Sequence, residues 1–121
     1  MRLLWTYLPD REAIAFQNEA RHADGIRVVA SDGEVIASER VRPAESGEPR
    51  TCGGGIRWPI AVLTLPADVI ADFRQGSAQG SQTRLATYRV EVAQSDGIWH
   101  PVSVDQLLDR AQLAGAPCYE W

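Results

Sequence analysis

The sequence contains no lysine and no long apolar segment. All 12 basic residues are arginine, and with 16 Asp and Glu residues the net charge is −4. A general nucleic-acid-binding protein needs a concentrated positive surface, which an acidic chain with scattered arginines does not indicate. No apolar run approaches the roughly 18 residues of a membrane-spanning helix, and residues 1–13 lack the apolar stretch of a signal peptide. We therefore expect a cytoplasmic protein without a membrane segment.

Cysteine and histidine are also scarce. Cys52 and Cys118 are too few to indicate a disulfide framework, and together with His22 and His100 they match no zinc-ligand spacing. Three glycines follow Cys52, but the next segment reads as a strand and no lysine is present, which argues against a phosphate-binding loop. A nucleophilic Cys52 would need a base beside it. We interpret it as a solvent-facing thiol, and we expect no metal site.

The length and the hydrophobic pattern predict one domain with one core. The fold class is α+β, with a mixed, mostly antiparallel sheet, two hairpins and about three helices. The expected elements are a strand over 2–7, a helix from Pro9 to Gly25, a hairpin over 25–41 turning at Asp32-Gly33, a buried central strand over 60–65, a short helix from Pro66, a hairpin of 84–93 with 98–104 turning at Asp96-Gly97, and a helix from Ser103 to Gly115. Flexible loops are expected at about 42–58 and 75–83. Pro101 suggests that the strand over 98–104 lies at an edge of the sheet or ends early.

Tryptophan is frequent for a chain of this size, at positions 5, 58, 99 and 121. Tryptophan and arginine are the residue types most enriched among binding hot spots. Arg50, Arg57 and Trp58 border the glycine-rich segment, and with Trp99 they form the candidate partner-binding set. The alternative is that Trp58 and Trp99 cover the two ends of the core. Trp5 is expected in the core.

Several segments resemble compact ADP-ribosyltransferase-like domains. LLWTYLPDREAIAFQNEARHADG is similar to the opening strand and helix of that family, GIRVVASDG to the next strand, AVLTLPADVIADFR to a later strand and short helix, and TYRVEVA to the strand with the catalytic glutamate. The resemblance implies that Glu91 would stabilise the oxocarbenium formed at the nicotinamide ribose of NAD, and that Thr6 would help to bind NAD. The family has His or Arg at the end of the first strand, where this chain has Trp5, Thr6 and Tyr7, so the NAD-binding pattern is incomplete.

No set of residues at catalytic spacing is identifiable, so we favour a role without enzymatic activity. The preferred hypothesis is a small acidic protein-binding module that inhibits or antagonises a partner protein, as an immunity protein or an antagonist of host defence does, with no cofactor. Residues 45–58 would then form a mobile surface loop that contacts the partner. The alternatives are an ADP-ribosyltransferase-like enzyme, active or degenerate, that uses NAD, and a homo-oligomeric accessory protein such as a homodimer.

Overall fold

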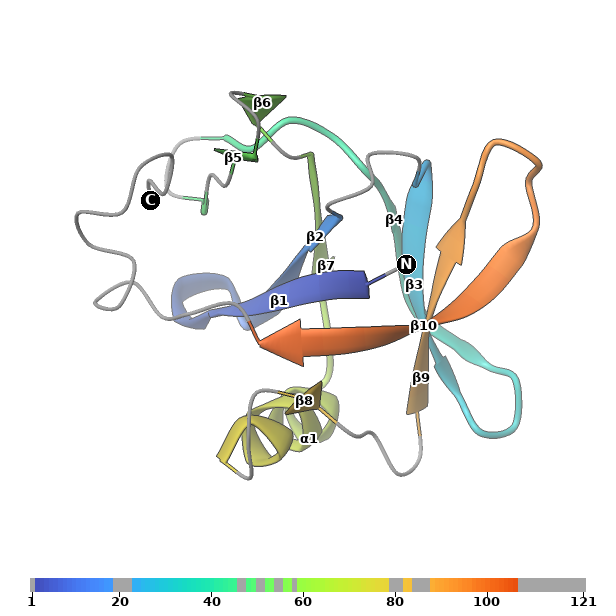
Figure 1. Cartoon of the computed structure of the whole chain (residues 1–121). Coiled ribbons are helices and arrows are strands. Elements are labelled where there is room, and N and C mark those ends of the chain that lie inside the picture. Colours follow the sequence, from blue (N-terminus) through green and yellow to red (C-terminus); the bar gives the residue numbers. More distant parts are fainter. Residues whose placement is uncertain are drawn as a thin grey trace.

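In the part of the chain that the structure describes, a strongly curled β-sheet has one α-helix at its side (Figure 1). The computed structural model describes residues 2–18, 23–45, 48–49, 52–53, 56–57, 59–78, 82–83 and 88–106. The elements are β1 (Arg2–Leu8), a 3₁₀ turn η1 (Pro9–Arg11), β2 (Ala13–Asn18), β3 (Gly25–Ala30), β4 (Val35–Arg40), β5 (Cys52–Gly53), β6 (Ile56–Arg57), β7 (Ile60–Thr64), α1 (Ala67–Ala78), β8 (Gln82–Thr83), β9 (Tyr88–Ala93) and β10 (Trp99–Gln106). The α+β class is confirmed, but the described residues contain one α-helix instead of about three.

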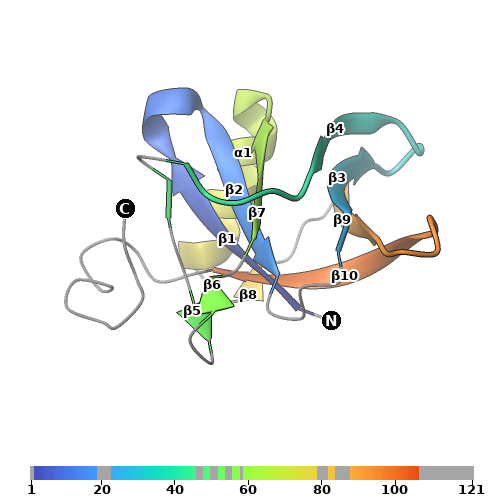
Figure 2. The same ribbon diagram turned by 90° about the horizontal axis from the view of Figure 1, so that it is seen from above.

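The main sheet curls until its two ends meet. The strand order is β4-β3-β9-β10-β1-β2-β7, with β8 also paired to β10, while β5 and β6 form a separate small sheet. Just beyond β4, Arg42 exchanges two backbone hydrogen bonds of 2.7 Å with Ile60 at the start of β7. The first half of β10 pairs antiparallel with β9 and its second half pairs parallel with β1. The result is a barrel-like wall, which Figure 2 shows from above.

The core fills the interior of this wall. Alternate residues of the strands point inward, as the two-residue period of a strand requires, and they are joined by apolar residues of α1. Phe73 of α1 makes edge-to-face contacts with Trp5 of β1 and Phe16 of β2, with ring centroids 5.6 and 5.7 Å apart. All three side chains are at most 1% exposed, and the prediction that Trp5 lies in the core is confirmed.

The helix predicted from Pro9 to Gly25 is wrong. Only Pro9–Arg11 form a 3₁₀ turn, and Glu12, with a left-handed φ of 47°, reverses the chain into β2. β2 pairs antiparallel with β1, with Trp5 opposite Phe16. The helix was predicted from the spacing of Ala13, Phe16 and Ala20, with Ile14 beside them, and alanine itself favours a helix. In the structure β2 instead pairs with β1 on one side and with β7 on the other, and residues 13–17 are buried on both faces. Tertiary contacts thus override a weak local pattern.

The last predicted helix is also replaced by a strand where it is described. Ser103 continues β10, because this segment pairs with β1 on one side and with β8 on the other; residues 107–115 lie outside the described residues. In contrast to the prediction from Pro101, β10 neither lies at an edge of the sheet nor ends early, because it pairs with β9 and then with β1 and continues to Gln106. Pro101 faces Glu91 of β9, and β1 joins the other side of β10 only from Ser103 onward. The proline therefore occupies a part of β10 with one paired neighbour, where a missing N–H is tolerated.

The remaining elements follow the predictions more closely. Both hairpins are confirmed, although their turns are not the expected two-residue type, because only the glycines have positive φ, 92° at Gly33 and 76° at Gly97. In each turn an aspartate Oδ1 accepts a 2.9 Å hydrogen bond from the backbone N–H two residues later. The helix after Pro66 is confirmed and continues through Ala78, into the predicted loop. β7 lies at the end of the pairing order, not at its centre.

Candidate partner-binding face

One wall of the barrel carries charged and aromatic side chains on its outer side. It consists of β4, β3, β9 and β10, whose inward residues include Ile26, Val28, Val90 and Val92. The outward residues alternate with them and stand opposite one another in the register of the sheet. We call the following set the outer face: Gly25, Arg27, Ser38, Arg40, Arg89, Glu91, Ala93, Trp99 and Pro101.

A carboxylate shared by two arginines occupies the middle of the outer face. Glu91 Oε1 accepts a hydrogen bond from Arg27 Nε at 2.8 Å and forms an ion pair with Arg27 Nη2 at 2.7 Å, and Glu91 Oε2 accepts a hydrogen bond from Arg89 Nε at 3.0 Å. Glu91 is 7% exposed. Its burial acts to raise the pKa, but the bonds from Arg89 and Arg27 outweigh it, so the pKa lies below its usual value. Glu91 is therefore ionised and holds both guanidinium groups in place.

Trp99 lies against this cluster and over a glycine. The guanidinium carbon of Arg27 is 4.2 Å from the centroid of the Trp99 ring, a cation–π contact. The ring also extends over Gly25, where an added Cβ would meet Trp99 Cη2 at 3.2 Å and the backbone oxygen of Glu39 at 3.4 Å. Gly25 thus leaves the space that the indole occupies. The Trp99 ring is half-buried, with Gly25 beneath it and the Arg27 guanidinium against it.

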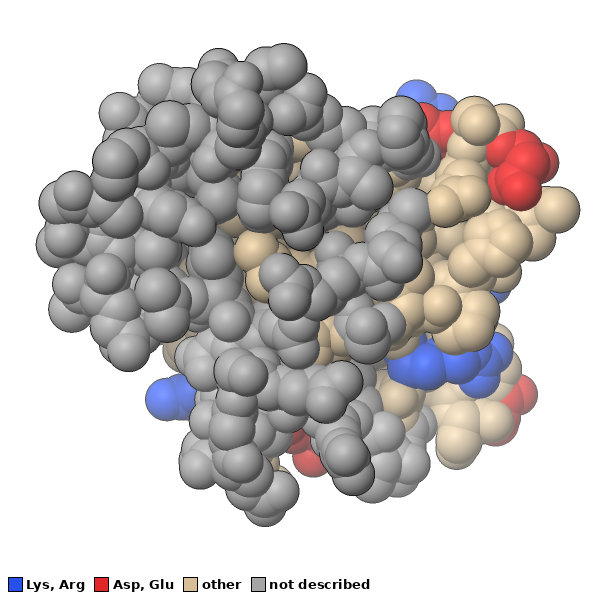
Figure 3. Space-filling model, in the orientation of Figure 1, with Lys and Arg blue, Asp and Glu red and all other residues tan. Residues whose placement is uncertain are grey.

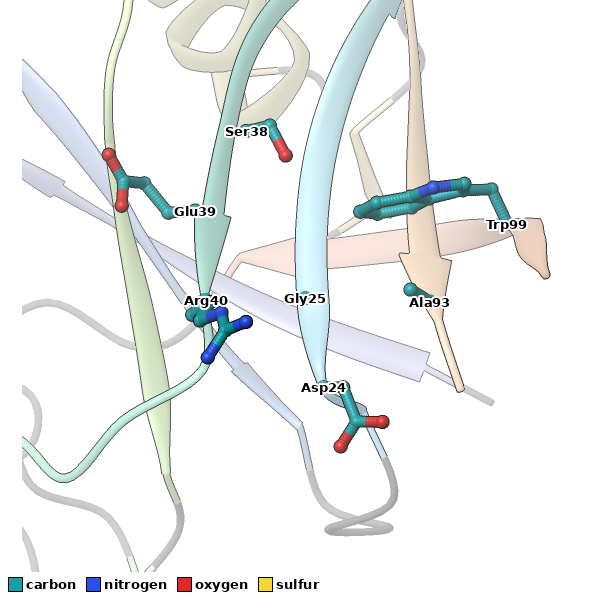
Figure 4. Close-up of a pocket in the computed structure, with 7 residues that line it drawn as sticks. All are labelled: Asp24, Gly25, Ser38, Glu39, Arg40, Ala93 and Trp99. Atoms are coloured by element: carbon teal, nitrogen blue, oxygen red, sulfur yellow. The ribbon is translucent and has the colours of Figure 1, made fainter. Parts of the chain in front are cut away.

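A shallow hollow of about 370 Å³ opens beside the ring. It is lined by Asp24, Gly25, Ser38, Glu39, Arg40, Ala93 and Trp99. Figure 4 shows Asp24 and Arg40 at the ends of their strands below the ring, while Glu39 points to the other side of β4. Within the described residues, the Asp24 carboxylate and the Arg40 guanidinium have no hydrogen-bond or ion-pair partner. Both charged groups are accessible to a partner.

A second buried carboxylate, Glu48, has a different role. It is fully buried and accepts hydrogen bonds from Arg42 Nη1 and Nη2 at 2.7 and 2.8 Å, from Arg11 Nη1 at 2.5 Å and from the Glu45 N–H at 2.7 Å. The Arg42 hydrogen bond is the largest of the effects that hold its pKa at about 2. These bonds fasten the segment after β4 to the turn between β1 and β2.

The anchor at Glu48 bears on the predicted loop. The neighbouring Pro49 is buried too, and its carbonyl accepts a 3.3 Å hydrogen bond from buried Gln17 Nε2. Two residues near the middle of the expected mobile loop are therefore packed against the sheet. No sequence signal distinguished Glu48 from the other acidic residues of the segment, because its partners Arg11 and Arg42 are brought together only by the fold.

The structure brings few of the predicted site residues together. Trp99 and Glu91 share the outer face, on neighbouring strands. Arg57 lies in β6 and its side chain is outside the described set, as are Arg50 and Trp58 altogether. The contact role predicted for these three residues stays a prediction. Arg27, Arg40 and Arg89 were missed, although their alternation with apolar residues places them on one face of each strand.

Thr6 and Glu91 do not form a common site. Thr6 lies in β1, buried and opposite Ala15. Glu91 of β9 pairs with Pro101 of β10, and Trp5 of β1 pairs with Gln106 of β10. Pro101 and Gln106 are five residues apart, so about 17 Å of strand separates Glu91 from the level of Trp5. Thr6 is one residue further. The two residues that the ADP-ribosyltransferase resemblance assigns to NAD are thus far apart along the wall.

The comparisons with known proteins provide no relative. No protein-family model matches the chain, and no curated protein or solved structure is significantly similar to it. Across the described ranges, no helix has the length and apolar character to cross a bilayer. In the same ranges, no three His, Cys, Asp or Glu side chains gather as metal ligands would. The outer face is the feature on which a function can be argued.

Proposed function

We propose that this protein is a protein-binding module that acts as an inhibitor or antagonist of its partner, and that it binds through the outer face around Trp99. The observation that carries the proposal is the fixed stack of Trp99 on Arg27, which Glu91 holds from the other side. Tryptophan and arginine are the side chains that most often dominate binding energy. Here both occur together, partly exposed, on a rigid sheet.

The preorganised geometry supports binding. An arginine that is free in solution loses side-chain entropy when a partner immobilises it, at a cost of about 0.5–1.5 kcal/mol. Arg27 and Arg89 are already held by Glu91, so most of that cost is met on folding. Ile98, next to Trp99, is 56% exposed and adds apolar surface. An aromatic group with apolar and charged neighbours is typical of a protein interface.

The same geometry argues against a catalytic role for Glu91. The role that the resemblance gives Glu91 is to stabilise a positively charged oxocarbenium, which requires a carboxylate whose negative charge faces the substrate. Both Glu91 oxygens instead accept hydrogen bonds from arginines, whose positive charges offset that of the carboxylate. We therefore place the enzymatic alternative behind the binding module.

The proposal is tested by affinity capture from host lysate with the wild type, Trp99→Ala and Arg74→Gln. Arg74 lies on α1, away from the outer face, and is exposed, so its variant shows whether a surface substitution elsewhere affects capture. We expect a stoichiometric partner with the wild type and Arg74→Gln, and loss of that partner with Trp99→Ala. Circular dichroism checks that each variant is folded.

Two results contradict the proposal. Equal capture by folded Trp99→Ala shows that the outer face is not the binding surface. A captured protein that gains the mass of ADP-ribose only when NAD is added shows that the protein is an enzyme. Light scattering on the same samples tests the homo-oligomer, since a dimer that Trp99→Ala converts to a monomer assigns this face to self-association.

A further inference from the structure

Three arginines form a diagonal line across the outer face. Arg89 of β9 stands opposite Val29, Arg27 is two residues before Val29 in β3, and Arg40 of β4 stands opposite Gly25, two residues before Arg27. Each arginine is therefore a diagonal neighbour of the next across paired strands. Diagonal neighbours in an antiparallel sheet are about 7–8 Å apart. We call Arg89, Arg27 and Arg40 the arginine stripe.

The stripe presents unused hydrogen-bond donors. Arg27 uses Nε and Nη2, and Arg89 uses Nε, to bind Glu91. Among the described residues, Arg27 Nη1, both terminal nitrogens of Arg89 and the whole guanidinium of Arg40 have no acceptor. The Arg89 side chain is 45% exposed and that of Arg27 24%. A guanidinium has five N–H donors and pairs well with carboxylates, so the free donors are suited to anionic groups of a partner.

The accessible charge on this face is positive although the protein is acidic. The one carboxylate of the outer face, Glu91, is 7% exposed and lies beneath two of the three arginines. Two exposed carboxylates lie at its borders: Asp24, which lines the hollow together with Arg40, and Asp96, which lies in the turn before Trp99. Figure 3 shows basic surface, in blue, on the side of the molecule that carries β9 and β10, with uncharged surface above it and acidic groups, in red, toward the edge of the view.

The spacing of the stripe matches an extended acidic segment. Alternate side chains of an extended chain point the same way and recur about every 6.6–6.8 Å, close to the 7–8 Å between diagonal neighbours in the stripe. Carboxylates at alternate positions could therefore each meet one arginine, while an intervening or flanking apolar side chain enters the hollow below Trp99. A helical segment places residues three or four apart on one face at about 5–6 Å, which matches the 7–8 Å of the stripe less closely than the repeat of an extended chain does.

A protein segment fits better than a nucleic acid. A long polyanion would extend beyond three arginines onto a molecule whose net charge is −4, where it would be repelled. A short acidic segment needs only the stripe. We infer that the partner presents an extended segment with acidic side chains at alternate positions, which binds along Arg89, Arg27 and Arg40 beside Trp99. This inference rests on the proposed function and specifies the chemistry of its partner.

The test measures binding of short fluorescent peptides to the full chain by anisotropy. The probe carries three glutamates at alternate positions among threonines and one leucine; a second peptide has the same composition with the glutamates adjacent, and a third has glutamine in their place. A single-stranded oligonucleotide with the same charge is the fourth probe. The protein variants are Arg40→Gln and Arg89→Gln, with Arg74→Gln as the matched control. In Arg89→Gln, Glu91 keeps its bonds to Arg27.

We expect the alternating peptide to bind at least about tenfold more tightly than the other two peptides, since each lost ion pair of about 1 kcal/mol is worth about fivefold in Kd. Arg40→Gln and Arg89→Gln should each weaken binding about fivefold, and Arg74→Gln should not. Binding should weaken as salt rises from about 50 to about 200 mM.

Similar binding of both glutamate peptides, or equal binding of the oligonucleotide, overturns the inference. If Trp99→Ala loses the partner but Arg40→Gln and Arg89→Gln bind the alternating peptide as tightly as the wild type, the proposed function stands and this inference fails. If folded Trp99→Ala captures the partner normally, the proposed function itself fails.

Discussion

The buried Glu48 carboxylate should make the stability of the protein depend on pH in a defined range. The pKa of this group falls from an ordinary 4.5 to about 2 on folding, chiefly because Arg42 donates two hydrogen bonds to it. A fall of that size corresponds to about 3 kcal/mol, since each pKa unit is worth about 1.4 kcal/mol. Because the folded pKa is the lower one, this stability is present in full above about pH 5. It is lost as the pH falls toward 2.

The substitution Glu48→Gln removes the charge at nearly constant shape. Loss of one partner of a buried ion pair costs about 3–5 kcal/mol, and the partly exposed Arg11 and Arg42 can regain some hydration, so we expect about 3 kcal/mol at pH 7. Natural domains have about 5–15 kcal/mol of stability in all. The variant should therefore be folded at pH 7 but clearly weakened.

Urea unfolding of the wild type, Glu48→Gln and the control Glu45→Gln, followed by circular dichroism between pH 7 and pH 2, tests this account. Glu45 is exposed, and its backbone N–H, which binds Glu48, is unchanged by substitution. The difference between wild type and Glu48→Gln should be about 3 kcal/mol at pH 7 and fall to below about 1 kcal/mol near pH 2. Glu45→Gln should follow the wild type throughout. A difference that stays constant with pH would refute the lowered pKa and the ion-pair anchor.

Three further substitutions test the core and the outer face. Phe73→Ala removes the edge-to-face contacts with Trp5 and Phe16 and should cost about 3–5 kcal/mol in chemical unfolding; a cost below 1 kcal/mol would mean that α1 does not close the core. Gly25→Ala places a Cβ about 3.2 Å from Trp99 Cη2, so the fluorescence emission of tryptophan should shift and partner binding should fall. An unchanged emission spectrum with unchanged binding would contradict the packing of the indole on Gly25. Glu91→Gln should lower the free energy of unfolding by about 1–2 kcal/mol, because it leaves two arginines without their charged partner. It should also weaken partner capture, because Arg27 is released from its fixed position. Loss of an ADP-ribose transfer activity in this variant would instead mark Glu91 as catalytic.

The sequence predicted best where turn chemistry and hydrophobic alternation agreed. Both hairpins follow from Asp-Gly turns between alternating strands, and α1 follows from Pro66 and the spacing of Val69, Ile70 and Phe73. The prediction failed at β10 from Ser103 onward, and at β2, where the alanines favour a helix by intrinsic propensity and the apolar residues fit a helical stripe. Only the long-range pairing of β2 with β1 and β7 makes this segment a strand. Local pattern carries no information about such partners.

The candidate site was predictable only in part for the same reason. Trp99 was selected by residue type, and it lies on the outer face. Arg27, Arg40 and Arg89 are separated by up to 62 positions in the chain, as the residue numbers show, and they form a line only in the register of β4, β3 and β9. No single strand of the sequence shows three arginines together, so composition suggested scattered charge where the sheet produces a positive face.

The two buried carboxylates differ in a way that separates stability from binding. Glu48 is fully buried and engages both terminal nitrogens of Arg42, together with Arg11 and a backbone N–H, so its site is complete without a partner. Glu91 binds Arg27 and Arg89 through part of their donors and leaves the rest open on the outer face. In the Glu91 cluster both carboxylate oxygens have hydrogen-bond donors, whereas several N–H groups of the two arginines have no acceptor among the described residues. Such a cluster is stable in the free protein and can still bind an anionic group of a partner. Substitutions at Arg40 and Arg89 should therefore change affinity with little effect on folding, whereas those at Glu48 should do the reverse.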